Sequence, residues 1–121
     1  MTTNELDKLK ESVKSLDHAL KFLPDARKDA FYFSGISKNF EVCLEYAWKH
    51  LKKKCVDEGV EVYSPKEIIK VAGRLKFIDN VEQWLSFLKD RNLAVHDYIG
   101  VSDEDYLKTI KAFHKEVKKL I

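Results

Sequence analysis

Apolar side chains recur every three or four residues along most of the chain, which is the spacing of one face of an α-helix. The first series predicts an amphipathic helix over about residues 4–22. A short link through Pro24 follows it, with one or two helical turns around residues 27–33. The longest series then predicts a second helix that ends near Gly59, since glycine commonly occupies the position after a helix.

Three further helices are predicted from their start signals. The tetrapeptide Ser-Pro-Lys-Glu at residues 64–67 combines a capping side chain, a proline suited to the first helical position and a glutamate that completes a capping box. A short helix is therefore predicted over about residues 65–75. Asp79-Asn80 is suited to cap a fourth helix, and Ser102, followed by acidic residues, opens the last one.

Composition supports the helical prediction. The chain has 121 residues, of which 45% are hydrophobic and 35% charged, and it contains only 4 glycines and 2 prolines. These are too few for a fold built from short strands and tight turns. We therefore predict an all-α fold, an up-and-down four-helix bundle with an additional short helix, as a single domain over residues 1–121. The 22 basic and 20 acidic residues leave a net charge of only +2, which does not indicate general polyanion binding.

The cysteines and the length of the apolar runs indicate where in the cell the protein is expected. Cys43 and Cys55 are the only cysteines, and on one helix they are about 18 Å apart, too far for a disulfide. Free thiols suit a reducing compartment, and no apolar run approaches the ~18–20 residues of a membrane span, so we expect a cytoplasmic protein without membrane contact. We also expect no cofactor and no metal, because the sequence has neither a glycine-rich phosphate loop nor typical metal-ligand spacing.

One stretch of the predicted fourth helix breaks the pattern. With Arg91 set at 0° on a helical wheel, the apolar side chains of this helix centre at about 65° and Asn92 lies at about 100°. Both polar residues therefore fall inside the apolar arc, and His96 stacks one turn after Asn92. A guanidinium is costly to bury without partners. Arg91 is therefore either a structural arginine paired with Asp90 or another carboxylate, or part of a groove or interface.

The same stretch carries a family resemblance. Residues 91–98 (Arg-Asn-Leu-Ala-Val-His-Asp-Tyr) resemble the Arg-Asn-x-x-x-His-x-Tyr signature of the HEPN superfamily, in particular its nucleotidyltransferase substrate-binding branch. Members of that branch also serve as toxins of HEPN/minimal-nucleotidyltransferase toxin–antitoxin pairs. The pattern of residues 40–52, the segments that contain Gly59 and Ser64, and Trp84, seven residues before the signature, are similar to the family in the same order.

The resemblance implies a bundle that forms a homodimer and brings two copies of the signature into one cleft, which in active members is a metal-independent endoribonuclease site. There His96 would act as general base or acid, and Arg91 would hold the phosphate and the charge of the transition state. Asn92 would orient His96 or donate to the phosphate. Tyr98, with Asp97 beside it at the rim, resembles the tyrosine that a separately encoded minimal nucleotidyltransferase adenylylates to silence the site.

Two functions from different classes are compatible with these residues. One is a HEPN-type endoribonuclease toxin neutralised by a cognate nucleotidyltransferase. The other is a non-catalytic substrate-binding subunit of a two-component nucleotidyltransferase, so whether the chain is an enzyme stays open. On an ideal helix Arg91 and His96 point about 140° apart, so a kink near Leu93 or a contribution across the dimer is needed for both to reach one phosphate.

A basic cluster on the longest predicted helix is a weaker candidate. Lys49, Lys52 and Lys53 are either contacts for an RNA backbone or part of a solvated helix face. The aromatic rings of Trp48 and Trp84 are expected in the core rather than as stacking platforms for bases.

Overall fold

The structure, a computed structural model, describes residues 5–95 and 103–121. Within these ranges every regular element is a helix, which confirms the all-α prediction. The long helices are α1 (Glu5–Ala19), α3 (Ala30–Asp57), α5 (Val81–Val95) and α6 (Asp103–Val117), the shorter ones are α2 (Leu23–Ala26) and α4 (Pro65–Arg74), and η1 (Leu20–Phe22) and η2 (Lys118–Leu120) are 3₁₀ turns.

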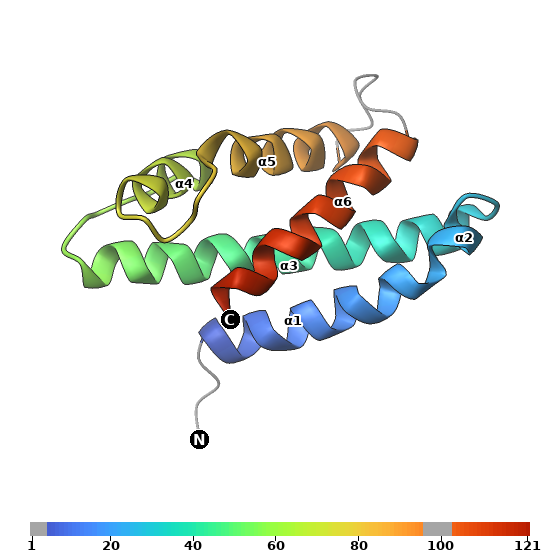
Figure 1. Ribbon diagram of the computed structural model, residues 1–121, viewed down its shortest axis with the longest axis horizontal. Coiled ribbons are helices and arrows are strands. Elements are labelled where there is room, and N and C mark those ends of the chain that lie inside the picture. Colours follow the sequence, from blue (N-terminus) through green and yellow to red (C-terminus); the bar gives the residue numbers. More distant parts are fainter. Residues whose placement is uncertain (1–4, 96–102) are drawn as a thin grey trace.

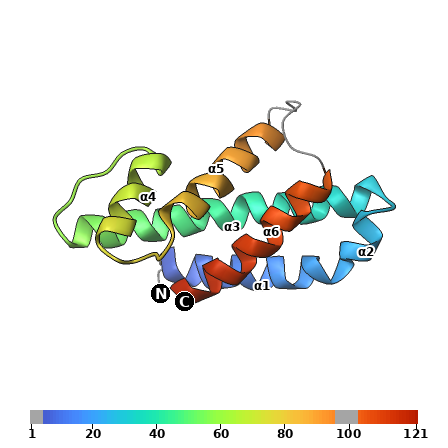
Figure 2. The same ribbon diagram turned by 45° about the horizontal axis from the view of Figure 1, so that its top comes forward.

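The four long helices alternate in direction along the chain (Figure 1). α1 packs along α3, α4 packs against α3 and α5, and α6 contacts α5, α1 and α3. The predicted up-and-down bundle with an additional short helix is therefore confirmed. Turning the molecule shows α5 and α6 lying over α3, with the C-terminal end of α5 and the N-terminal end of α6 at the same end of the bundle (Figure 2). That end holds Arg91 and Asn92, the first two residues of the segment singled out by its sequence.

α3 begins and ends at recognisable signals. The side chain of Asp29 accepts a hydrogen bond of 2.9 Å from the backbone N–H of Phe31, which caps the helix. After the last turn Gly59 has a φ of 84°, a conformation that glycine adopts without steric cost. The N–H of Val60 then donates to the carbonyl of Cys55 over 3.0 Å, which completes a Schellman motif. The predicted end at Gly59 is confirmed.

The next two helices also start where the sequence predicts. The hydroxyl of Ser64 accepts a hydrogen bond of 3.1 Å from the N–H of Glu67 at the start of α4. The side-chain oxygen of Asn80 accepts one of 3.0 Å from the N–H of Gln83 at the start of α5. Each cap satisfies a backbone donor that has no partner within its own helix.

The link after the first helix differs from the prediction. Pro24 does not interrupt the helical path, because it lies in the first turn of α2, where its missing N–H needs no partner. The chain turns instead at residues 27–29. The helical turns expected around residues 27–33 are the beginning of α3 at Ala30.

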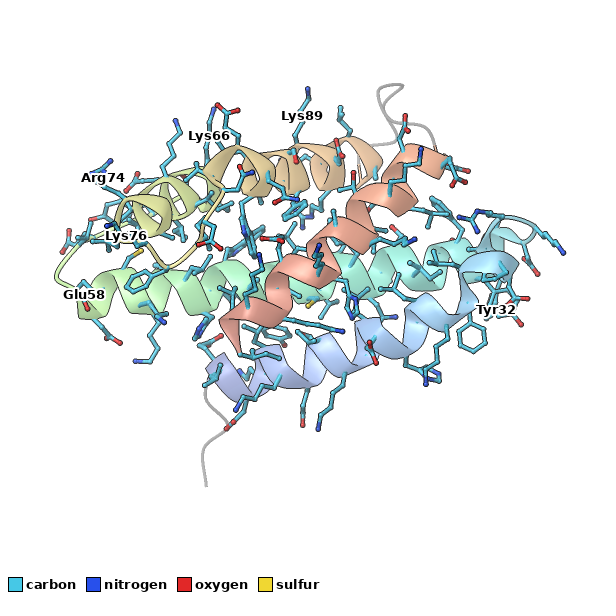
Figure 3. The ribbon with its side chains drawn as sticks, in the orientation of Figure 1. Tyr32, Glu58, Lys66, Arg74, Lys76 and Lys89 are labelled. Atoms are coloured by element: carbon cyan, nitrogen blue, oxygen red, sulfur yellow. The ribbon has the colours of Figure 1, made fainter. Side chains whose placement is uncertain are left out.

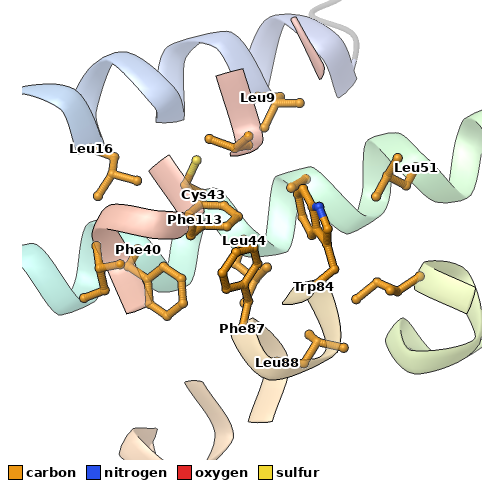
Figure 4. Close-up of a cluster of buried hydrophobic side chains, with 14 of the residues drawn as sticks. Leu9, Leu16, Phe40, Cys43, Leu44, Leu51, Trp84, Phe87, Leu88 and Phe113 are labelled. Carbon is orange, nitrogen blue, oxygen red and sulfur yellow. The ribbon is translucent and has the colours of Figure 1, made fainter. Parts of the chain in front are cut away.

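Aromatic side chains from three helices fill the centre of the bundle (Figure 4). Phe113 of α6 packs edge-to-face against Phe40 of α3 and against Trp84 and Phe87 of α5, with ring centroids 5.2, 5.7 and 5.4 Å apart. This is a favourable arrangement for aromatic quadrupoles. Trp84 lies in the core as predicted. Phe87, only 1% exposed, was not part of the apolar face that the sequence assigned to this helix.

The cysteine prediction is also confirmed, since Cys43 and Cys55 are both free and buried. Burial raises the pKa of the Cys43 thiol to about 11, against a smaller opposing effect of a hydrogen bond with Ser12. Among the residues that the structure describes, no helix is both long and apolar enough to cross a membrane.

Candidate functional site

Arg91 lies on the last turns of α5 and is half-buried against α3. Its guanidinium carbon is 5.6 Å from the centroid of the Trp48 ring, within the range of a cation–π interaction. Trp48 is itself half-buried at the edge of the core, so the prediction of a core tryptophan holds only in part. Its ring supports the charged group that the sequence pattern singled out.

The hydrogen bonds of Arg91 are incomplete within the described residues. Nη1 donates to the side-chain oxygen of Asn92 over 3.2 Å. Nε is buried and has no hydrogen-bond partner in the described part of the chain. A buried donor without a partner costs about 1–3 kcal/mol, more when the group is charged. Within the described residues, the arginine therefore has a hydrogen-bond donor that no acceptor uses.

The sequence left open that Asp90 or another carboxylate neutralises Arg91. Within the described ranges, Arg91 forms no ion pair with Asp90 or with any other carboxylate. Asp90 instead accepts a hydrogen bond of 2.6 Å from the hydroxyl of Thr109 on α6. That short bond joins α5 to α6 one residue before the arginine. Asp90 therefore links the end of α5 to α6, and the guanidinium of Arg91 has no carboxylate partner among the described residues.

Asn92 does not lie within the buried face of α5, contrary to the wheel prediction. Its side chain is exposed. The reason is Phe87, which together with Trp84 and Leu88 forms the buried face and shifts its centre toward Arg91 and away from Asn92. The amide of Asn92 is thus available to solvent while its oxygen accepts from Arg91.

A hydroxyl pair that the sequence did not suggest lies between α3 and α6. The oxygens of Ser37 and Tyr106 are 3.2 Å apart. Burial is the main cause that raises the pKa of Tyr106, and the charges of Glu41, Arg91 and Asp90 act on it in opposing directions. Tyr106 therefore stays neutral at physiological pH and can donate or accept a hydrogen bond.

One sequence signal could have identified Tyr106. It starts the apolar series that continues through Ile110 and Phe113 on α6. The sequence analysis did not include Tyr106 in this series, because the acidic residues 103–105 before it indicated only the start of a helix.

The remaining signature residues, His96, Asp97 and Tyr98, lie outside the described residues. Their roles stay predictions. α5 is an uninterrupted helix through Leu93 to Val95, so no helix break occurs at Leu93.

The lysine cluster on α3 resembles a solvated face more than a binding site. Lys49 pairs with Glu45 at 3.2 Å and Lys53 pairs with Asp57 at 3.5 Å, each four residues apart along the helix. Lys52 is exposed. Pairs of this kind are worth a few tenths of a kcal/mol and compete with any phosphate for the same ammonium groups.

The chain is similar to known proteins both in sequence and in fold. The family model described as "Nucleotidyltransferase substrate binding protein like" matches residues 4–121. A solved structure of a tri-AMPylated Shewanella oneidensis HEPN toxin in complex with an MNT antitoxin has a similar fold, with a TM-score of 0.82 at 13% identity, over 97% of this chain and 90% of that one. A Haemophilus influenzae protein, described as the substrate-binding domain of a nucleotidyltransferase, aligns with a TM-score of 0.76 at 20% identity, over 93% of each chain. None of the curated protein sequences matches this chain.

Proposed function

Since the chain belongs to the family of nucleotidyltransferase substrate-binding-like proteins, we propose that it is a HEPN-type endoribonuclease toxin that a cognate nucleotidyltransferase neutralises. One observation carries the proposal. Arg91, five residues before His96, rests on the Trp48 ring with a buried Nε that has no hydrogen-bond partner among the described residues. A planar cation with unused donors is suited to bind the oxygens of a phosphate.

The proposed reaction is an intramolecular transesterification of RNA. The ribose 2′-oxygen attacks the adjacent phosphorus, forming a 2′-O–P bond and breaking the bond to the 5′-oxygen of the next nucleotide. His96 of one subunit accepts the 2′-hydroxyl proton, and protonated His96 of the second subunit delivers a proton to the leaving 5′-oxygen. The products are a 2′,3′-cyclic phosphate and a 5′-hydroxyl, so atoms and charge balance without an added reactant.

Arg91 would stabilise the negative charge that accumulates on the non-bridging oxygens of the phosphorane. The exposed amide of Asn92 would donate to the same phosphate or orient His96. The reaction calls for two copies of the signature, so the proposal includes a homodimer. A half-buried arginine at the surface of one subunit is compatible with a cleft shared by two.

Neutralisation is proposed at Tyr98. Its phenolic oxygen would attack the α-phosphorus of ATP bound by the partner nucleotidyltransferase and release pyrophosphate, leaving a bulky, anionic adenylyl group two residues after His96. The Shewanella oneidensis HEPN toxin of similar fold is tri-AMPylated and bound to an MNT antitoxin, which supports the same relation here.

The test of the nuclease is cleavage of transfer and messenger RNA by the purified protein in EDTA. We expect His96→Ala to reduce the rate by about 10²–10⁴-fold and Arg91→Ala by about 10²–10³-fold. Lys14→Ala, which changes an exposed cation on α1, is the control and should leave the rate unchanged. Wild-type protein that forms a dimer and cleaves no RNA would refute the nuclease.

The second candidate is the non-catalytic substrate-binding subunit. The likeness to the Haemophilus influenzae domain favours it, because that domain is described as binding substrate for a nucleotidyltransferase. It predicts a stable complex with a neighbouring nucleotidyltransferase and transferase activity only in that complex. If the free chain cleaves RNA as well as the complex does, and His96→Ala loses this cleavage, substrate binding is excluded as the only role of the chain.

A further inference from the structure

The outer face of α4 is a row of cations. Lys66, Lys70 and Arg74 follow one another at four-residue spacing and are all exposed, so they lie along one side of the helix about 6 Å apart. The apolar residues of α4 lie on the opposite side in the core. Lys66 and Arg74 point away from the bundle in Figure 3.

These three cations have no counter-ion in the described part of the chain. No ion pair involves them there, whereas Lys49 and Lys53 on α3 and Lys118 and Lys119 near the C-terminus each have at least one. The segment of residues 65–78 contains four basic residues and one acidic residue. This short segment therefore has a net charge of +3, against +2 for the whole chain.

The fourth cation of the segment occupies a strained position. Lys76 has a φ of 66°, in the left-handed region that favours glycine. Its N–H donates to the carbonyl of Gly73 over 3.1 Å, and the N–H of Phe77 donates to that of Ala72 over 2.8 Å, which is a Schellman motif. A glycine would close this motif without strain, and the lysine instead adds a fourth cation just after α4.

An exposed aromatic ring lies at the other end of the row. Tyr63, immediately before the cap residue of α4, is 74% exposed. Its hydroxyl donates to Glu61 over 2.7 Å, and its exposed fraction means that most of the ring is accessible to solvent. An aromatic platform next to a line of cations is the arrangement by which proteins bind single-stranded nucleic acid, with bases stacked on the ring and phosphates along the cations.

We propose that Tyr63, the outer face of α4 (Lys66, Lys70 and Arg74) and Lys76 just after that helix bind single-stranded RNA. The inference rests on the proposed function for its ligand class, since the bound strand would supply the nuclease site. A protein partner fits less well, because lysine is depleted in protein interfaces and the α4 face lacks the apolar core that such interfaces contain. Lys89 on α5 projects from the same edge of the molecule as Lys66 in Figure 3 and adds a further exposed cation to that edge.

The test is equilibrium binding of a fluorescein-labelled, unpaired RNA of about 12 nucleotides to full-length protein. His96→Ala is present in every sample, so that cleavage does not obscure binding. We expect the triple variant Lys66→Gln, Lys70→Gln, Arg74→Gln to bind at least about tenfold more weakly at moderate salt. The slope of log Kd against log salt should fall by about 2, since each lost contact with a single strand contributes about 0.7.

Matched variants separate this surface from general electrostatics and from folding. Lys14→Gln, Lys111→Gln, Lys115→Gln removes three exposed cations from α1 and α6 and should retain wild-type affinity. Tyr63→Ala should weaken binding at least about fivefold, whereas Tyr63→Phe, which keeps the ring, should not.

Equal loss in both triple variants, or wild-type affinity and slope in the α4 triple variant, overturns the inference. Retained RNA binding together with loss of a complex with a neighbouring nucleotidyltransferase also overturns it and assigns α4 to that protein. Failure of the proposed function is a separate result: α4-dependent binding without RNA cleavage by the wild-type chain refutes the nuclease and leaves the binding surface standing.

Discussion

Removing the Trp48 ring should uncouple Arg91 from α3. The guanidinium carbon lies 5.6 Å from the ring centroid, and both side chains are half-buried. Cation–π interactions contribute about 0.5–1 kcal/mol at exposed sites and about 2 kcal/mol when desolvated. The partial burial of this pair places its coupling near 1 kcal/mol.

A double-mutant cycle measures this coupling without any assumption about function. Urea unfolding of wild type, Trp48→Leu, Arg91→Ala and the double variant gives the free energy of unfolding of each. Trp48→Leu also loses packing against the core, but the cycle cancels that loss because it occurs with and without Arg91. Trp48→Phe keeps an aromatic face and should retain part of the coupling.

If the endoribonuclease proposal holds, the same contact positions the arginine for the phosphate. A coupling near 1 kcal/mol corresponds to a loss of about fivefold in kcat/KM for Trp48→Leu, with Trp48→Phe between it and wild type. Leu75→Ala, at the end of α4, removes packing elsewhere and serves as the control with unchanged kcat. A coupling free energy below about 0.3 kcal/mol, the usual error of such cycles, would refute the assignment of Trp48 as the support of Arg91.

Four further predictions concern stability and reactivity. Gly73→Ala should lower the free energy of unfolding by about 1 kcal/mol, or the Tm by about 4 °C. The added methyl group overlaps the Val81 side chain, and this overlap costs more free energy than the better helix propensity of alanine contributes. Val81→Ala should remove the effect in a calorimetric comparison. Lys76→Gly should raise the stability by about 0.5–1 kcal/mol, since it relieves the left-handed conformation, and unchanged or lower Tm would contradict this. Cys43, with a pKa raised to about 11 by burial, should react with iodoacetamide at pH 8 only as fast as the chain opens, as read by mass spectrometry; rapid labelling of the folded protein would count against its burial. Burial, with neighbouring lysine charge, lowers the pKa of His50 in the folded protein. The unfolded chain therefore binds more protons below about pH 6.5, and stability is lost as the pH falls through the folded pKa. His50→Gln should reduce the fall in Tm between pH 7 and pH 5, and an unchanged fall would contradict this assignment.

The parts of the fold that the sequence predicts are those that depend on local interactions. Capping by Ser64 and Asn80 and the turn at Gly59 involve residues within three or four positions of one another, so the sequence contains both partners. The prediction at Pro24 was wrong because the residue is equally suited to end one helix or to begin the next. Only packing decides between these.

The site was harder to predict because its contacts join distant segments. Arg91 was identified by its place on the wheel, but its support comes from Trp48, more than forty residues away. Tyr106 pairs with Ser37 across α6 and α3, which no pattern within either helix specifies. Periodicity indicates that a polar residue faces the core, and only the assembled bundle shows which ring it meets there.

The predictions about function came from similarity in sequence to a family, because packing within one chain indicates the fold and not the function. The signature at residues 91–98 led to the family, and the family model matches nearly the whole chain. The proposed homodimer, nuclease activity and modification of Tyr98 would depend on contacts between chains, which a single chain's pattern of apolar residues does not contain.

The central claim, that Arg91 and His96 cleave RNA through the ribose 2′-hydroxyl, is tested most directly by the ends of the products. RNA incubated with the wild-type protein in EDTA is analysed by mass spectrometry for its terminal groups. The account predicts fragments that end in a 2′,3′-cyclic phosphate and begin with a 5′-hydroxyl. Intact RNA, or fragments with a 5′-phosphate and a 3′-hydroxyl, would contradict it, because a 5′-phosphate requires attack by water rather than by the neighbouring ribose oxygen.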